Sequence, residues 1–184
     1  MEVVGRVDPG CLVFVDEMST HTSLAPLYAY APIGERAFVE IPRNRGKNTT
    51  LLSSLHAGGM GPSMAVQGAT PACVFETYVE RLLAPTLRPG QLVVMDNLGA
   101  HRTEMVKELI EARGCELLFL PPYSPDLNPI EEAFSKVKNA LRKAGARTHG
   151  ALLGAMDEAL SSVTPVDVAG WFSHCGYRVE VRYL

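Results

Sequence analysis

Residues 11–17 read CLVFVDE, a continuous apolar run that leads directly into an acidic residue, Asp16. A second stretch of the same kind, QLVVMDN at 91–97, leads into Asp96. Apolar runs without alternation are typical of strands that are covered on both faces, so we expect both strands to be central in a sheet. If they are parallel neighbours, the two aspartates emerge at the same sheet edge, where ligands of open α/β sheets bind.

The rest of the chain predicts further strands and helices around this pair. Other strands are expected at 37–42 (AFVEIP), 48–57 (NTTLLSSLHA), 63–68 (SMAVQG, after a turn at GGMGP) and 115–121 (CELLFLP). Helices are expected from a Thr70 cap to Pro85 or slightly beyond, at 104–114, from Pro129 onward, at 149–163 and at 165–172. This order predicts an α/β fold with a mixed central sheet flanked by helices.

Length and composition favour one globular domain. With 184 residues, 47% of them apolar, the chain is expected to form a single domain with a core at about 11–145 and a helical tail at about 148–177. There is no apolar run of about 18 residues and no secretory signal, so no membrane contact is expected. Four widely spaced cysteines without a CxxC pair indicate reduced thiols in a cytoplasmic protein.

Positive charge is local in this chain. The net charge is −3, so the chain as a whole is not a basic nucleic-acid binder. Two basic clusters are candidate DNA contacts: Arg43, Arg45 and Lys47, and Lys136, Lys138, Arg142 and Lys143. The alternative, that these are simply solvated loop and helix surfaces, stays open at this point.

A proline-rich stretch, LPPYSPDLNPIEEAF at 120–134, precedes a third carboxylate, Glu131. Each proline restricts its own backbone and that of the residue before it, which predicts a stiff loop. Asn128 is a favoured helix N-cap and Pro129 suits the first helical position. Glu131 then either closes a capping box on Asn128 or serves as a ligand that the loop holds in place.

Asp16, Asp96 and Glu131 would come from three rigid elements and would repel one another if they converged. A divalent cation removes this repulsion, and hard carboxylate oxygens favour Mg²⁺ or Mn²⁺. Two such ions would suit phosphodiester chemistry. Glu131 and Glu132 cannot face the same point, because one residue is about 100° of helical rotation. Glu17 is expected to point away from Asp16, since side chains alternate along a strand.

Three motifs carry a resemblance to a known family: VDE at 15–17, VVMDNLGAH at 93–101 and LPPYSPDLNPIE at 120–131. With 34 residues between Asp96 and Glu131, they resemble the catalytic domain of DDE transposases of the mariner superfamily, especially its bacterial insertion-sequence branch. The resemblance runs from about Leu12 to Tyr177 and implies a ribonuclease H-like fold. It implies Asp16, Asp96 and Glu131 as the catalytic, metal-binding triad, holding two Mg²⁺ or Mn²⁺ ions.

The resemblance also implies cut-and-paste DNA transposition, by metal-dependent strand cleavage and strand transfer. The implied partners are the element ends, target DNA and a second copy of the chain, and the implied place is the bacterial cytoplasm at the nucleoid. Asn97, His101 and Asn128 are expected to support the triad. His101 would either orient a water or phosphate, or cap the following helix.

The sequence departs from the family pattern at its start. Relatives carry a helix-turn-helix region before the first catalytic strand, whereas here that strand begins about ten residues from Met1. A separate helix-turn-helix polypeptide or an upstream half is therefore an expected partner, and the chain could be a frameshifted second half, a truncation or a fragment. Two other functions stay open: a stand-alone ribonuclease H-like nuclease, and a non-catalytic remnant that associates with full-length transposase.

Overall fold

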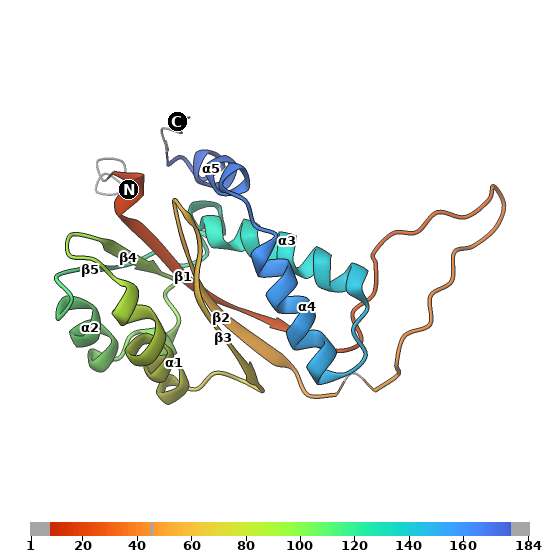
Figure 1. Cartoon of the computed structure of the whole chain (residues 1–184), viewed down its shortest axis with the longest axis horizontal. Coiled ribbons are helices and arrows are strands. Elements are labelled where there is room, and N and C mark those ends of the chain that lie inside the picture. The colour runs from red at the N-terminus through yellow and green to blue at the C-terminus, as the bar shows by residue number, and fades with distance from the viewer. Residues whose placement is uncertain (1–7, 45, 178–184) are drawn as a thin grey trace.

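A five-stranded mixed sheet forms the centre of the molecule in the computed structural model, which describes residues 8–44 and 46–177 (Figure 1). The strands are β1 (Leu12–Thr20), β2 (Thr49–His56), β3 (Gly59–Gln67), β4 (Leu92–Met95) and β5 (Glu116–Phe119), in the order β3-β2-β1-β4-β5. β1 pairs parallel with β4, and β4 parallel with β5, while β1, β2 and β3 are antiparallel. The predicted mixed sheet is confirmed, with the two most apolar strands as parallel neighbours.

Helices cover both faces of this sheet (Figure 1). They are α1 (Ala72–Tyr78), α2 (Glu104–Glu111), α3 (Pro129–Ala144), α4 (His149–Ser161) and α5 (Pro165–His174). Short 3-10 turns occupy Pro9–Cys11, Ala84–Thr86, Gly99–His101 and Pro125–Leu127, and a π-helical turn spans Val79–Leu83. α3 ends at Gly145, whose φ of 58° is the left-handed conformation that glycine adopts without strain.

Alternation along β1 explains the two layers. Leu12 and Phe14 pack into the cluster that contains α3, α4 and α5, whereas Val13 and Val15 pack into the cluster that contains α1 and α2. All four side chains are at most 3% exposed, as expected for a strand covered on both faces. Asp16 therefore lies on the α3 side of the sheet, because it continues the row of Leu12 and Phe14.

The C-terminal helices belong to the same core as the sheet. Leu152 and Met156 of α4 and Phe172 of α5 are at most 2% exposed and join the cluster of Phe14. The Phe172 and Phe14 rings meet edge to face, with centroids 5.5 Å apart. None of the described helices combines the length and apolar character that a membrane span needs.

Some local predictions are wrong. The hairpin turn is Ala57–Gly58, and β3 already begins at Gly59, because an edge strand tolerates the glycines that suggested a longer turn. The helix cap is Pro71 rather than Thr70, and the segment tightens into a 3-10 turn around Pro85, which has no backbone N–H to continue an α-helix. The strand predicted at 115–121 is shorter, β5 at Glu116–Phe119, and it is only half-buried because it lies at the sheet edge.

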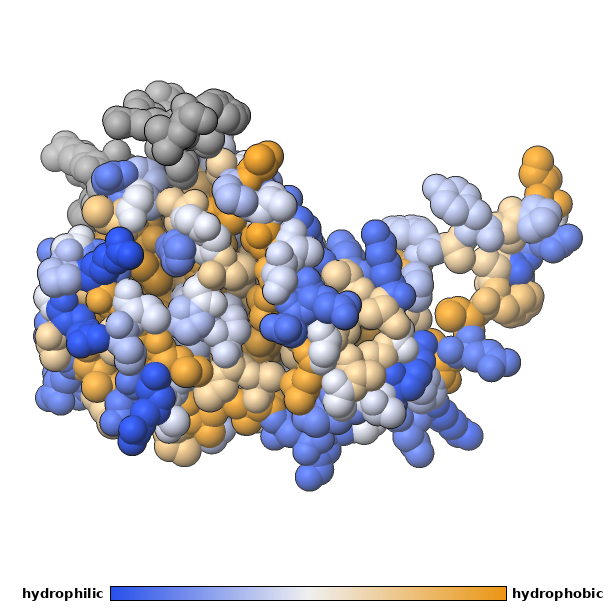
Figure 2. Space-filling view, viewed as in Figure 1, coloured by the Kyte–Doolittle hydropathy of each residue, from blue (hydrophilic) through white to orange (hydrophobic). Residues whose placement is uncertain are grey.

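An extended arm, described at residues 21–44 and 46–48, lies between β1 and β2 and projects from the body of the molecule (Figure 1). The strand predicted at 37–42 lies in this arm and does not form, since no neighbouring strand pairs with it. Large apolar and aromatic side chains are exposed along the arm: Leu27, Tyr28, Tyr30, Ile33, Phe38, Val39 and Ile41. Figure 2 shows hydrophobic residues on the surface of the projecting arm. At its base, the Arg147 guanidinium donates to the carbonyl oxygens of Thr22 and Leu24.

Candidate active site

The structure brings the three predicted carboxylates to one cavity of about 520 Å³. Val15 of β1 pairs with Met95 of β4, so Asp16 and Asp96 follow at the same edge of the parallel pair. Asp16 does not end its strand, because β1 continues to Thr20 against β2. It lies at the point where β1 loses its parallel neighbour β4. Glu131, in the first turn of α3, supplies the third carboxylate.

The proline loop forms one wall of this cavity. Residues 120–125 line it, together with Asn97 and Leu98 from the segment after β4. The loop is attached at both ends: the Leu120 N–H donates to the Met95 carbonyl oxygen, and the Tyr177 hydroxyl to that of Leu127. A stiff loop between two fixed ends is the support that the prolines predict for the start of α3.

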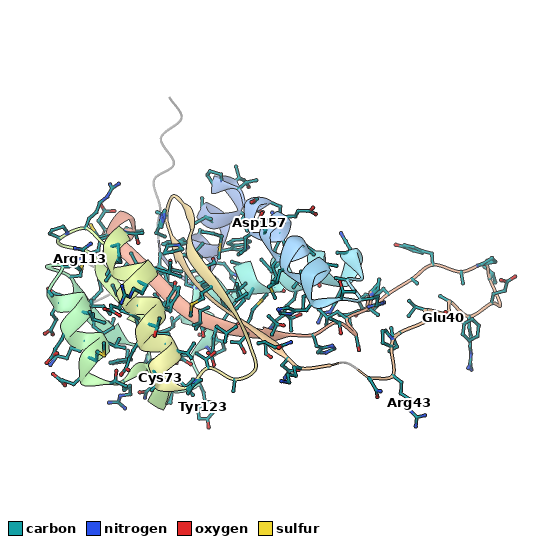
Figure 3. All side chains as sticks on the ribbon, turned by 60° about the horizontal axis from the view of Figure 1, so that its bottom comes forward. Glu40, Arg43, Cys73, Arg113, Tyr123 and Asp157 are labelled. Carbon is teal, nitrogen blue, oxygen red and sulfur yellow. The ribbon has the colours of Figure 1, made fainter. Side chains whose placement is uncertain are left out.

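Tyr123 at the tip of this loop has a strained backbone. Its φ of 57° is the only positive value among the non-glycine residues that the structure describes. Its ring is fully exposed and projects from the body of the molecule, well away from the arm that carries Glu40 and Arg43 (Figure 3). Packing of the ring therefore does not offset the strain of the backbone. Such strain is often found at functional sites.

Asp16 is the most constrained of the three carboxylates. It is 5% exposed, and its Oδ1 accepts a hydrogen bond of 2.7 Å from the Glu17 N–H. Its Oδ2 accepts one of 2.7 Å from the Asn128 side-chain amide. Burial raises the pKa of Asp16 to about 7; the Glu17 N–H opposes this, and the negative charges of Glu131 and Asp96 add to it.

Asn128 occupies the N-cap position of α3, as the sequence predicts, but its side chain does not cap the helix. Its side chain makes no hydrogen bond to the first turn of α3 and reaches across to Asp16, 112 residues away in the chain. Local rules favour Asn at this position as a cap, but the buried carboxylate is the stronger acceptor because it is negatively charged. Of the two alternatives for Glu131, the capping box is therefore wrong.

Asp96 is held by His101. The Nδ1 of His101 lies 2.5 Å from the Asp96 Oδ1, and the buried imidazole stacks on Phe75, with ring centroids 4.0 Å apart. Burial acts to raise the pKa of Asp96, but the hydrogen bond and charge of His101 and the Leu98 N–H outweigh it, so the pKa is below its usual value. His101 does not cap the next helix; the Thr103 hydroxyl does, accepting from the Val106 N–H.

The other acidic residues near the site, Glu131, Glu132 and Glu17, line three different cavities. Glu131 is exposed at the cavity, and its carboxylate has no hydrogen bond or ion pair with any residue in 8–44 or 46–177. Glu132 pairs with His174 of α5 and lines a different cavity. Glu17 lines a third cavity, beside Ser19 and Lys47. Only Glu131 therefore shares the cavity of the two aspartates.

The donor set suits a hard divalent cation, although the carboxylates are not gathered around a single point. In the described part of the chain, no three Asp, Glu, His or Cys side chains lie close enough together to hold a metal ion. Burial is the main cause of the raised pKa of Asp16, and the negative charges of Glu131 and Asp96, which a cation would offset, add to it. Asp96 is partly exposed and Glu131 is exposed, so both side chains have room to turn toward Asp16. These residues fit a Mg²⁺ or Mn²⁺ ion.

Residues 11–152 match the model of a protein family described as DDE superfamily endonuclease. The chain belongs to this family. Across 87 residues the DDE domain is 32% identical to the Transposable element Tcb2 transposase of Caenorhabditis briggsae, a match that covers 45% of this chain and 32% of that protein. The family predicted from the three motifs is confirmed.

Solved structures of Mos1 transposase share the fold of the DDE domain. The Mos1 paired-end complex with left transposon end gives a TM-score of 0.71 at 20% identity, over 90% of this chain and 52% of that one. Structures of the Mos1 catalytic domain with raltegravir and Mg, and with raltegravir and Mn, each give a TM-score of 0.68 over 95% of this chain. Their sequence identities are 16% and 17%. These two matches cover 87% and 86% of the Mos1 chains. The predicted ribonuclease H-like fold is confirmed, and the DDE domain spans about half the length of the Mos1 chain in the paired-end complex.

The predicted DNA-contacting residues of the DDE domain lie in two regions. Arg43 and Lys47 are exposed on the arm, and Arg45 lies outside the described residues. On α3, Lys138 and Arg142 lie about two and three turns beyond Glu131 and share its face. The other two lysines, Lys136 and Lys143, line the cavity of Glu132 instead. Lys136 is already engaged by Asp167, at 2.5 Å.

Sequence reasoning missed one contact of the DDE domain that matters at the site. The stacking of Phe75 on His101 joins α1 to the segment after β4, and nothing in the local sequence of either residue indicates it. Asn128 was expected to support the triad, but its N-cap preference before Pro129 gave no indication that it does so through a hydrogen bond to Asp16.

Proposed function

We propose that this chain is the catalytic domain of a DNA transposase, which cleaves DNA strands at the ends of a mobile element and joins them to target DNA. One observation carries the proposal: Asp16, Asp96 and Glu131, from three separate elements, line one cavity at the carboxyl edge of two parallel strands. Membership of the DDE endonuclease family and likeness to a Mos1 complex with a transposon end support it.

The three carboxylates are proposed to hold two divalent cations, Mg²⁺ or Mn²⁺. Similar Mos1 catalytic-domain structures with Mg and with Mn support this, as does the fit of the donor set. When bound, such ions supply Lewis-acid activation of a water or hydroxyl nucleophile and stabilise the leaving oxygen of a phosphodiester. Asp16 would be the fixed ligand, while Asp96 and Glu131 turn to complete the site.

The protein groups around the triad have separate roles in this proposal. His101 holds Asp96 ionised, since its imidazole and the Leu98 N–H both favour the carboxylate form. The proline loop keeps the start of α3, and with it Glu131, at a constant distance from the sheet. Correct placement of ligands is a large part of phosphoryl-transfer catalysis.

DNA is proposed to run along the face of α3 that carries the half-buried Lys138 and Arg142. Both follow Glu131 on the same side of the helix, so a phosphate backbone bound there leads into the cavity of the triad. Phosphate contacts set the position of a duplex but carry no sequence information. Recognition of the element's terminal repeat is therefore assigned to a helix-turn-helix region, in an upstream half or a separate polypeptide. The match to the Tcb2 transposase covers only 32% of that protein, which leaves room for such a region.

The active form is proposed to be a homodimer bound to DNA, in the cytoplasm of a bacterial cell at the nucleoid. The arm supports a second copy, because its exposed apolar side chains, among them Tyr30, Ile33 and Phe38, have no cover within the described chain. Residues 1–184 are proposed to act as one catalytic domain, since α4 and α5 complete the core under the sheet. Light scattering with and without DNA measures the assembly.

A matched pair of neighbouring carboxylates tests the function. Supercoiled plasmid and a duplex with a free 3′-hydroxyl are incubated with the chain and Mg²⁺ or Mn²⁺, and nicking and strand joining are measured. Glu131→Gln is expected to abolish both reactions, whereas Glu132→Gln, one residue away and in another cavity, retains them. Metal-independent nicking, or equal loss in the two variants, would contradict the proposal.

A further inference from the structure

Asn128 occupies an unusual position for a residue that immediately precedes a helix. It is 3% exposed, and its side-chain amide N–H donates 2.7 Å to the Asp16 Oδ2, while its Oδ1 accepts from no backbone N–H of α3. The first turn of α3 compensates only in part: Pro129 has no N–H to satisfy, and the Glu131 N–H donates to the Asn128 carbonyl oxygen. The side chain is therefore used for a contact between distant parts of the chain, at the expense of the local cap.

This contact completes the restraint on the Asp16 carboxylate. Its two oxygens accept from different elements: Oδ1 from the Glu17 N–H in β1, and Oδ2 from Asn128 at the start of α3. With one fixed donor on each oxygen, the plane of the carboxylate cannot rotate without breaking a buried hydrogen bond. Such a bond to a buried charged group is stronger than a neutral one.

The same contact links two members of the triad. Glu131 lies three residues after Asn128, and Pro129 and Ile130 between them are buried and rigid. The bond between Asn128 and Asp16 therefore attaches the helix start that carries Glu131 directly to the strand that carries Asp16.

We propose that Asn128 is a positioning residue that sets the separation of the Asp16 and Glu131 carboxylates for metal binding. The inference rests on the proposed metal site and adds a residue that does not itself bind metal. Groups that hydrogen-bond to metal ligands typically change metal affinity by about 10- to 100-fold when they are removed. The expected consequence is a loss of affinity without a comparable loss of fold.

Two substitutions separate positioning from helix capping. Asn128→Ala removes both the bond to Asp16 and any capping ability. Asn128→Ser retains a residue that caps helices well but is too short to reach Asp16, so it can restore the start of α3 without restoring the carboxylate contact. Thr148→Ala is the matched control, because the Thr148 hydroxyl caps α4 by accepting from the Ala151 N–H, away from the cavity.

Mn²⁺ affinity is measured by titration calorimetry on the metal-free proteins, and melting temperatures are recorded without metal. We expect both Asn128 variants to bind Mn²⁺ at least about tenfold more weakly than wild type, with Asn128→Ser melting closer to wild type than Asn128→Ala. Thr148→Ala is expected to melt lower and to bind Mn²⁺ as wild type does.

Wild-type Mn²⁺ affinity in Asn128→Ser would overturn the inference while leaving the metal site intact. Equal weakening in Thr148→Ala would also overturn it, since general destabilisation would then explain the loss. Failure of the wild-type protein to bind Mn²⁺ would overturn the proposed metal site, and this inference with it. If Asn128→Ala does not fold, Asn128→Ser alone decides the result.

Discussion

Neutralising Asp16 is expected to stabilise the metal-free protein at neutral and alkaline pH. Burial and the charges of Glu131 and Asp96 raise the pKa of Asp16 from 3.8 to about 7. A folded-state pKa above the unfolded value means that the folded protein binds this proton more tightly. The resulting stability is fully present below the unfolded pKa and is lost as the pH rises through about 7.

The magnitude follows from the same values. A change from 3.8 to about 7 corresponds to about 4 kcal/mol of stability lost on ionisation. This is an upper limit, because the amide of Asn128 donates to the carboxylate and favours its charged form. We therefore expect Asp16→Asn to exceed wild type by about 2–4 kcal/mol at about pH 8, and to match it at about pH 4.

The new side chain can be accommodated where Asp16 now lies. Asn at this position can accept from the Glu17 N–H and present its amide N–H to Asn128, whose Oδ1 is buried and has no partner within the described residues. Rotation of the Asn128 amide then satisfies both groups. The variant is therefore expected to keep the fold while losing the metal site.

Urea denaturation with a chelator, from about pH 4 to about pH 8, measures the difference between the two proteins. The pKa of His56 is lowered by burial and by Arg88, so its neutral form adds stability as the pH rises. Subtracting the two curves removes this contribution, because both proteins contain His56. Asp157→Asn, an exposed change on α4, is the control and should follow wild type. Parallel curves for wild type and Asp16→Asn would refute the argument, and Mn²⁺ should stabilise wild type alone.

Three further changes test the loop and the DNA path. Tyr123→Gly should leave the free energy of unfolding unchanged or raise it by up to about 1 kcal/mol, because a left-handed backbone costs a non-glycine residue about 1–2 kcal/mol and the exposed ring contributes no packing. A clear loss of stability in denaturant unfolding would contradict this. Pro129→Gly should lower the nicking rate by about 10- to 100-fold while stability falls by only about 1 kcal/mol, and unchanged nicking would show that the proline does not position Glu131. Lys138→Ala with Arg142→Ala should make the slope of log binding constant against log salt concentration shallower by about two, as measured by fluorescence anisotropy with duplex DNA. An unchanged slope would place the DNA elsewhere.

Much of the fold could be predicted from local patterns. Apolar runs before Asp16 and Asp96 indicated two central strands, and Pro129 after Asn128 indicated the start of α3. The strand predictions succeeded because burial on one or both faces leaves a direct mark on the order of apolar residues. The same patterns could not show that residues 37–42 have no partner, since a strand exists only where another strand supplies its hydrogen bonds.

The sequence by itself determined the family, the three carboxylates and the rigid loop before the third, because these depend on residue type and spacing along the chain. Only the tertiary structure decided what surrounds each carboxylate. It buried Asp16 beneath α3, stacked His101 on Phe75 and turned Asn128 away from its helix. Burial and contacts between distant segments control pKa values and hydrogen-bond choice. They are properties of the packed chain that no local pattern records.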